Sequence, residues 1–517
     1  MFYKPKTGSI WDPSVIYFKG KYYMLCMYLR PGSNRQDAMW LAESEDGVHW
    51  KDHGSVLIAE HDVYKMFPYI CGDKCLINYG SSRTVPGSDN DTLYYCESSD
   101  MLHWTQFRED HPDERWYNPA GRWDHMYVAP KDEGEGYWGY VVATPKPQLH
   151  SAWGMMESQN GYEWTILPPP IIEWGRLPEI SVLEGGGCEK IGDEYYYIGG
   201  VGGYARNCGY GLYTFRSQSP TGPFHPDEEA FRLCGFDRLP GHIFLQNLAA
   251  FCRGENDELL ISNAFDAGGY GNIWLLPMRK AVTDAAGHLR LGYWSQNDRA
   301  KGEQLPMQRQ YSVLISERDG RPEGAPCGQF DIPDESSLFL ASDSGHPCFA
   351  LTDSYALAVQ QKSYDLEQGI VVEGCFTADI CPNGVGSIAW PDCWRNSSVG
   401  FYIEYEGAVV GMAFMLELGH PYHRVSSVEN LRKKELKLQS ELLDVTGEGC
   451  ATVQGADKDI PHSFRLFLRG IMAELYVDDL LVQSFPLLEK TSGRIGFVTR
   501  NAECRWEQLC IRALNLE

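Results

Sequence analysis

Apolar residues, many of them aromatic, alternate with polar ones in short runs throughout residues 1–280. Residues 21–28 (KYYMLCMY) and 194–198 (EYYYI) are two such runs, and Gly, Asp and Asn bound them. Alternation with a period of two is typical of β-strands, and the bounding residues are typical of hairpin turns. No long stretch with a helical period competes with this pattern. The sequence therefore predicts an all-β protein.

Four segments that end in an aromatic residue resemble one another: 43–50 (ESEDGVHW), 97–104 (ESSDMLHW), 157–164 (ESQNGYEW) and, more loosely, 216–224 (RSQSPTGPF). They start 54, 60 and 59 residues apart. A repeat of this length holds about four strands and is typical of a propeller blade, whose small sheet needs neighbours to cover its faces. Residues 245–252 and 258–262 form a fifth, weaker unit. We therefore expect a five-bladed β-propeller over residues 1–310.

The repeat disappears after this region, where residues 316–326 are polar and rich in turn formers. We expect a linker over residues 311–335 and a second domain over residues 336–517. Short alternating strands predict a β-sandwich for this domain. They are residues 399–405, 464–468, 473–477 and 494–499. Residues 427–436 fit either a helix within the sandwich or a charged surface excursion.

Charge and composition narrow the range of partners. The 517 residues carry a formal net charge of −25, spread without a long acidic run. This argues against nucleic-acid binding, which needs clustered Lys and Arg, and favours a neutral partner such as a small carbohydrate. The first residues include no apolar stretch, and no window approaches a membrane span, so a cytoplasmic protein without a membrane partner is expected. The 16 cysteines are scattered and are interpreted as reduced thiols. The oligomeric state, a homo-oligomer included, stays open.

Three acidic residues occupy one phase of the repeat. Asp12 heads the inner strand of the first unit and Glu184 that of the fourth, and each precedes a turn glycine, Gly20 or Gly192, by eight residues. Asp124 heads the third unit. Propeller sites lie where the innermost strands begin, so these side chains are expected to converge on the axis. The corresponding positions of the second and fifth units, near residues 64–68 and 246–247, carry no obvious acid, although Asp62 is close.

Converging carboxylates suit the hydrolysis of glycosidic bonds. One carboxylic acid protonates the leaving oxygen, and a carboxylate attacks the anomeric carbon or activates water. The third holds substrate hydroxyls and raises the pKa of the acid by repulsion. No cofactor and no catalytic metal are needed, while a structural calcium ion on the axis stays open. Each acid taken alone also fits a turn opener or a strand end. Glu189 is the alternative to Glu184 as the acid.

Several residues near these acids are candidates for substrate binding. Trp11, Trp123 and Tyr127 could stack on a sugar ring or serve as buried packing. Arg122, His125 and His242 could bind hydroxyls or form structural hydrogen bonds, and Glu189 belongs to the same candidate set. Residues 185–187 (GGG) would let a sugar approach the backbone, or would form a bulge.

These motifs resemble the glycoside hydrolase superfamily that unites families 32, 68, 43 and 62. Residues 40–50 (WLAESEDGVHW) resemble the segment that closes the first blade in family 32, and residues 11–16 (WDPSVI) resemble the opening of family 43. Residues 122–124 (RWD) are similar to the Arg-Asp-Pro motif of family 32, with one residue inserted and the proline lost. Residues 464–479 resemble a strand pair of the family 32 sandwich. Family 32 is thus the closest match.

The resemblance implies that Asp12 is the nucleophile, or the base in the manner of family 43. It implies that Asp124 stabilises the transition state and that Glu184 is the acid/base. Family 32 normally has Asn before its first Asp and Asn-Gly after the Pro, and its acid is followed by Cys-Pro rather than Gly-Gly. We therefore expect an exo-acting glycosidase on short oligosaccharides, with β-fructofuranosides cleaved by a retaining double displacement. The alternatives are an inverting arabinofuranosidase or xylosidase, a propeller phosphorylase and a non-catalytic sugar-binding propeller.

Overall fold

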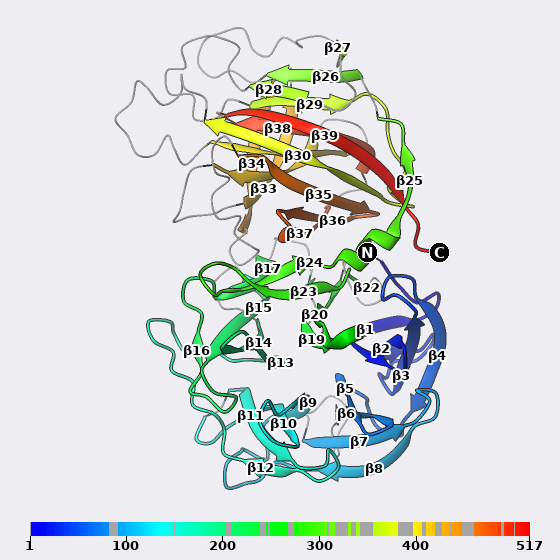
Figure 1. Cartoon of the computed structure of the whole chain (residues 1–517), viewed down its shortest axis with the longest axis vertical. Helices are drawn as coiled ribbons and strands as arrows, with labels where there is room; N and C mark the ends of the chain where they lie inside the picture. The colour runs from blue at the N-terminus through cyan, green and yellow to red at the C-terminus, as the bar shows by residue number, and fades with distance from the viewer. Residues whose placement is uncertain are drawn as a thin grey trace. The chain divides into compact units, whose positions relative to one another are not determined.

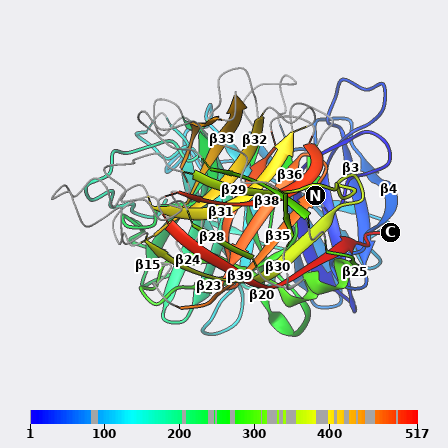
Figure 2. The ribbon, with the colours of Figure 1, turned by 90° about the horizontal axis from the view of Figure 1, so that it is seen from above.

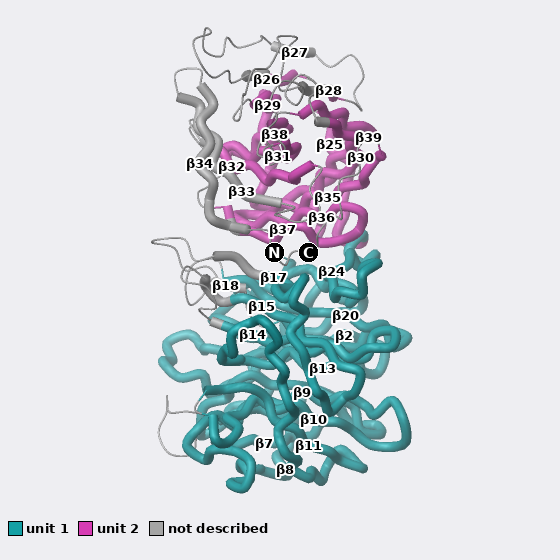
Figure 3. The backbone as a smooth tube through the Cα atoms, turned by 90° about the vertical axis from the view of Figure 1, so that its left-hand side faces the viewer, with its two compact units in different colours: residues 1–298, 516–517 teal, residues 299–515 magenta. Residues whose placement is uncertain are grey.

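The computed structural model describes most of the chain: residues 2–81, 91–148, 150–202, 208–237, 245–246, 249–266, 273–307, 310–315, 329–331, 338–341, 355–380, 397–405, 410–418, 426–434, 437–446, 460–487, 491–500 and 502–517. It divides into two compact units, residues 1–298 with 516–517 and residues 299–515 (Figure 3). Within the described ranges the helical segments are the short 3₁₀ turns η1 (Glu255–Asp257) and η2 (Ser295–Ala300). None of the described helices is long and apolar enough to cross a membrane.

The first unit is a propeller of five antiparallel blades (Figure 1). The first blade contains β1 (Ser9–Phe18), β2 (Lys21–Leu29), β3 (Ala38–Ser44) and β4 (Lys51–Ile58). The second contains β5 (Met66–Cys71), β6 (Lys74–Ser81), β7 (Thr92–Ser98) and β8 (Thr105–Asp110). The third contains β9 (Trp123–Pro130), β10 (Tyr137–Ala143), β11 (Ala152–Ser158) and β12 (Thr165–Leu167). The predicted five-bladed propeller is therefore confirmed, with the strand order that the repeat implied.

The last two blades have interrupted strands. The fourth contains β13 (Glu184–Ile191), β14 (Glu194–Gly202) and β15 (Cys208–Ser217), with β16 (His225–Pro226) and β17 (Arg232–Asp237) both paired to β15. The fifth contains β18 (Leu245–Gln246), β19 (Ala250–Arg253), β20 (Leu259–Ser262), β21 (Ala264–Asp266), β22 (Ile273–Leu275), β23 (Arg279–Thr283) and β24 (Leu289–Tyr293). The N-terminal segment closes the ring, because Tyr3 pairs with Leu275 of β22.

The innermost strands form a ring around the axis. Contacts join β1 to β5, β5 to β9, β9 to β13, β13 to β19 and β19 to β1. Apolar side chains fill the space between adjacent blades, as in the cluster that includes Leu41 of the first blade and Ile77 of the second. This packing holds the inner strands at the same height around the axis. Residues at equivalent positions of the repeat therefore lie at the same end of the axis.

The repeated sequence motif is a turn between the third and fourth strands of a blade. In the first blade, Ser44 Oγ accepts the N–H of Gly47 at 2.8 Å, and Asp46 Oδ1 accepts the N–H of His49 at 2.9 Å. Ser98 with Asp100, and Ser158 with Asn160, repeat these bonds in the next two blades. The repeat therefore encodes side-chain capping of a tight turn and contributes no catalytic group.

The second unit contains two antiparallel sheets. One includes β26 (Gln310–Ile315), β27 (Gln329–Asp331), β29 (Tyr355–Gln360), β31 (Ser398–Tyr405), β32 (Val410–Glu417), β33 (Ser426–Lys434), β34 (Lys437–Thr446) and β38 (Thr491–Arg500). The other includes β25 (Lys301–Leu305), β28 (Leu338–Ala341), β30 (Ile370–Ile380), β35 (His462–Arg469), β36 (Met472–Val477), β37 (Leu480–Pro486) and β39 (Ala502–Leu514). Figure 2 shows β30, β35 and β39 side by side from above.

Aromatic contacts connect the two sheets. The rings of Phe401 and Phe464 lie 4.6 Å apart, and those of Phe497 and Trp506 lie 5.1 Å apart. The predicted β-sandwich is confirmed.

The helix considered for residues 427–436 is wrong, because β33 pairs with both β32 and β34 and this tertiary pairing overrides local helix propensity. The unit boundary falls at 298/299, and strands β26 and β27 lie inside the stretch expected to be a linker.

Candidate active site

Asp12, Asp124 and Glu184 lie at the start of inner strands β1, β9 and β13. Asp12 is 4% and Asp124 2% exposed, whereas Glu184 is partly exposed. The three residues are close enough to act on one another electrostatically. Burial raises the pKa of Asp12 well above its ordinary value, and repulsion from Glu184 and, less strongly, Asp124 adds to this rise. The structure thus brings together the three acids that the repeat phase selected.

Asp12 has an unusual backbone conformation. Its φ is +44°, in the left-handed region, and the strand pairing shifts between Trp11 and Ser14, which marks a bulge. Asp tolerates this region better than most residues, although the following proline restricts it further. Ser14 donates from Oγ to the carbonyl of Met66 at 2.7 Å and ties the bulge to the second blade. The bulge therefore determines where the Asp12 side chain leaves the strand.

Asp124 is held as an ionised carboxylate. Arg122 donates from Nη2 to Asp124 Oδ2 at 2.6 Å, and the backbone N–H of His125 donates to Oδ1 at 2.7 Å. Burial opposes ionisation of Asp124, but the contacts with His125 and Arg122 outweigh it and hold its pKa well below the ordinary range. Arg122 also donates to the carbonyl of Leu183, next to Glu184. These contacts therefore favour the ionised form of Asp124.

The role of His125 in substrate binding stays a prediction, and the structure shows contacts of its ring with protein groups. Its side chain is 1% exposed, its Nε2 accepts the N–H of Gly185 at 3.3 Å, and its Nδ1 lies 3.4 Å from Asp124 Oδ1. The ring is enclosed between the third and fourth blades and positions groups on both. Arg122 keeps a partly exposed side chain beside Asp124, which is compatible with a contact to substrate.

Glu189 is a structural carboxylate and not the alternative acid. It is 3% exposed, its Oε1 accepts the hydroxyl of Tyr127 at 2.6 Å, and its Oε2 pairs with Arg253 at 2.5 Å. Five residues along a strand correspond to roughly 16 Å, so Glu189 lies far from the end of β13 that carries Glu184. The candidate substrate-binding role for Glu189 is therefore wrong, because partners from two other blades occupy both of its oxygens.

The aromatic candidates separate into buried and partly exposed residues. Trp123 is fully buried and its ring lies 5.0 Å from that of Tyr117, so the prediction that it stacks on a sugar is wrong. Its side chain points into the hydrophobic core between the second and third blades. Trp11 is partly buried against the core of the first two blades and stays a candidate. His242 lies outside the described residues.

Packing around the axis explains the run of glycines after Glu184. A Cβ at Gly186 would lie 2.0 Å from the carbonyl oxygen of Ala249, and one at Gly187 would lie 2.3 Å from the Tyr127 ring. Gly187 also has a φ of +101°, and the strand register shifts beside it. The glycines therefore allow close packing of inner strands through a bulge, and the space beside Gly186 and Gly187 is occupied by protein.

The sequence analysis missed two residues of the site, Lys65 and Gly80. Lys65 is 2% exposed and reaches the backbone of Asp12 from the second blade. A Cβ at Gly80 would lie 1.9 Å from Asp124 Oδ1, so the absence of a side chain makes room for the carboxylate. Lys65 falls within residues 64–68, the positions of the second unit that correspond to those of the candidate acids. A search for basic residues at that phase would have found it.

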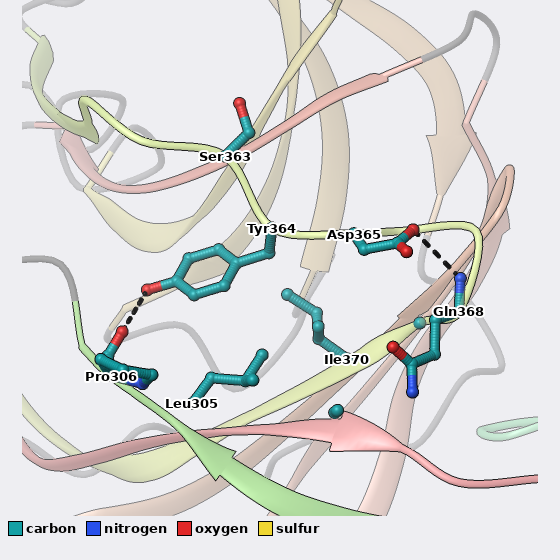
Figure 4. Close-up of a pocket in the computed structure, with 9 residues that line it drawn as sticks. Leu305, Pro306, Ser363, Tyr364, Asp365, Gln368 and Ile370 are labelled. Carbon is teal, nitrogen blue, oxygen red and sulfur yellow. Dashed lines mark hydrogen bonds between the residues drawn. The ribbon is translucent and has the colours of Figure 1, made fainter.

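A separate pocket of about 240 Å³ lies in the second unit (Figure 4). Its lining includes Tyr364, Asp365 and Gln368. Asp365 Oδ1 accepts the N–H groups of Glu367 and Gln368, and Gln368 Nε2 donates to the carbonyl of Leu514 at 3.2 Å. These polar groups are thus engaged with neighbouring backbone, and the pocket includes none of the three acids.

Comparison with known proteins identifies the fold. No family model matches the sequence, and no curated protein matches it. Solved structures do match at low identity, including sucrose-6-phosphate hydrolase from Lactobacillus gasseri, with a TM-score of 0.63 and 10% identity over 98% of this chain and 91% of that one. A family 32 β-fructofuranosidase from Bombyx mori gives 0.59 and 12% over 99% and 92%. Exo-inulinase from Aspergillus awamori gives 0.60 and 11% over 100% and 98%. The chain therefore has the propeller-and-sandwich fold of the family 32 glycoside hydrolases along almost its whole length.

Proposed function

We propose that the protein is a retaining, exo-acting glycoside hydrolase that cleaves β-fructofuranosides of short oligosaccharides. The observation that carries the proposal is the convergence of three carboxylates with distinct electrostatic surroundings at one end of the inner strands. The fold supports it, because the matching structures include a β-fructofuranosidase and an exo-inulinase. The short substrate follows from the predicted cytoplasmic location, which stays a prediction.

The three acids have different proposed roles. Asp12 attacks the anomeric carbon and forms a glycosyl-enzyme, while Glu184 protonates the leaving oxygen. Glu184 then removes a proton from a water molecule. This water attacks the anomeric carbon, and the bond to Asp12 breaks, which regenerates the free carboxylate. The partial exposure of Glu184 suits proton exchange with solvent. Asp124, held ionised by Arg122, stabilises the positive charge that develops on the sugar ring.

Asp12→Asn, Asp124→Asn and Glu184→Gln test these roles on a panel of sucrose, sucrose 6-phosphate, 1-kestose, inulin and aryl arabinosides. We expect each variant to lose at least about 1,000-fold in kcat on the best substrate, because each removes a group used in the transition state. Asp62→Asn is the control, since Asp62 pairs with Arg35 and lies outside the three acids. Undiminished hydrolysis by Asp12→Asn would overturn the assignment.

The stereochemistry of the product tests the mechanism separately. Proton NMR during the first turnovers should show the anomer that retains the configuration of the substrate. The inverted anomer would instead support the family 43 type of hydrolase, for which the Asp12-Pro13 opening is the specific argument. A requirement for phosphate would indicate a phosphorylase. Calorimetric binding without turnover would indicate a sugar-binding propeller.

A further inference from the structure

Lys65 is a buried lysine at the centre of the propeller. It directly precedes β5 in the second blade and is 2% exposed. Its Nζ donates to the carbonyl oxygens of Asp12 at 3.1 Å and Pro13 at 3.0 Å, both in the first blade. The ammonium also lies 5.0 Å from the centroid of the Phe67 ring. One side chain thus holds two successive carbonyls of the bulge that presents Asp12.

The Asp12–Pro13 segment needs such support. A non-glycine residue in the left-handed region is strained, and it persists where contacts with the surrounding structure hold it there. The bulge also carries the Asp12 carboxylate, so a contact that holds this backbone helps to set the position of the carboxylate. Two bonds from a single buried donor fix the carbonyl of the Asp12–Pro13 peptide and that of the following Pro13–Ser14 peptide.

The charge of Lys65 is as unusual as its position. Burial lowers the pKa of this ammonium, and the negative charges of Asp12 and Glu184 oppose that effect. Its hydrogen bonds go to uncharged carbonyls, so the positive charge is not neutralised at contact distance by those acceptors. The other nearby cation, Arg122, pairs directly with Asp124. Lys65 is therefore placed to act on the charge of Asp12.

We propose that Lys65 is a positioning residue for Asp12: its ammonium holds the bulged backbone that carries the carboxylate and supplies a positive charge that opposes protonation of Asp12 beside Glu184. The inference rests on the proposed function, in which ionised Asp12 is the nucleophile. Among the described residues, Asp124 and Arg122 also act electrostatically on Asp12, and Cys26 on β2 and Cys252 on β19 act on the ammonium of Lys65. Asp266 on β21 is a further buried acid on an element that contacts β1.

The test removes the charge of Lys65 and measures the ionisation of Asp12 directly. Lys65→Met keeps the approximate volume, and Lys65→Gln keeps a donor for one carbonyl in case the first variant does not fold. With ¹³C-labelled aspartate, the infrared difference between each protein and its Asp12→Asn counterpart isolates the titration of Asp12 without any substrate. We expect its midpoint to move up by about one pH unit or more in both variants. Lys65→Arg, which keeps the charge, should leave it close to that of the wild type.

Kinetics on the best substrate of the panel provide the second measurement. The acid limb of kcat/KM should move to higher pH in Lys65→Met, with kcat at neutral pH at least about tenfold lower and KM little changed. Lys74→Met is the matched control, because Lys74 lies on β6 of the same blade and pairs with Glu97 at 2.8 Å. An Asp12 midpoint that stays in place in the neutral variants would overturn the proposal. If the wild type hydrolyses nothing, the proposed function fails while the infrared titration still decides the role of Lys65.

Discussion

Replacing Gly80 by alanine should displace Asp124 and so test whether this carboxylate belongs to the active site. Gly80 lies on β6, and an added Cβ would lie 1.9 Å from Asp124 Oδ1 and 3.2 Å from its Cα. Ordinary contacts begin at 3.4 Å, so the carboxylate oxygen must move by the difference, about 1.5 Å, or the second and third blades must separate. Gly80 has no positive φ, so backbone strain does not contribute.

The magnitude follows from the contacts that would change. Overpacking of a filled interior costs about 1–3 kcal/mol. The displaced oxygen also loses the 2.7 Å bond from the N–H of His125, which, as a hydrogen bond to a charged group, contributes about 1.5–3 kcal/mol. Because relaxation reduces both effects, we expect the free energy of unfolding to fall by about 2–4 kcal/mol. A misplacement of about 1 Å costs on the order of 100-fold in rate, so kcat/KM should fall at least that far.

Urea unfolding and steady-state kinetics on the best fructoside measure both effects. Gly292→Ala is the matched control, because Gly292 is a strand glycine of the fifth blade whose added Cβ would meet the side chains of Val282 and Lys280 at 3.2–3.4 Å. Equal stability and equal kcat/KM for the two variants would refute the geometry of Asp124 described above. A loss of stability with unchanged kcat/KM would refute its role in the reaction alone.

Three further predictions concern other groups. Glu189→Gln should lower the free energy of unfolding, measured in urea, by about 2–3 kcal/mol, because it weakens two buried contacts. Its kcat/KM should stay within about tenfold of the wild type, and a loss of about 1,000-fold would show that Glu189 takes part in the reaction. Burial, followed by repulsion from Glu184, raises the pKa of Asp12. The acid limb of kcat/KM should therefore lie above the ordinary aspartate value of about 4, and an acid limb at or below that pH would contradict this. Burial opposes ionisation of Asp124, but its basic neighbours hold its pKa well below the ordinary value. Its stabilisation is therefore fully present above about pH 4 and declines as the pH falls further, so the unfolding free energies of wild type and Asp124→Asn should begin to converge below about pH 4.

The fold was accessible from the sequence because its information is local and repeated. The first three blades carry the same capped turn, and Ser44 with Asp46 shows why: their side chains accept hydrogen bonds from backbone N–H groups a few residues away. A motif with such a short range leaves similar residues at the same positions of these three copies. The helix considered within residues 427–436 does not form in β33 for the opposite reason, because the state of this strand depends on pairing with β32 and β34.

The site was accessible in part. The phase of the repeat indicates which end of an inner strand a residue occupies, and this is sufficient to bring Asp12, Asp124 and Glu184 together. Phase does not indicate which face of the strand a side chain occupies or what already fills the space. The side chain of Trp123 points into a hydrophobic core, and the carboxylate of Glu189 binds Tyr127 and Arg253. Both residues nevertheless lie on strands that carry a candidate acid.

Alternation, turn chemistry and the recurring motif establish the strands, the blades and the position of each acid along its strand, because these properties depend on neighbours a few residues away. The charge state and direction of those acids depend on side chains from other blades. Lys65 reaches Asp12 across 53 residues, and Gly80 leaves the volume that Asp124 occupies. Such contacts form only when the inner strands meet around the axis. A hydrogen bond or a repulsion depends on the distance between two groups in space, and the spacing of residues along the sequence does not determine that distance.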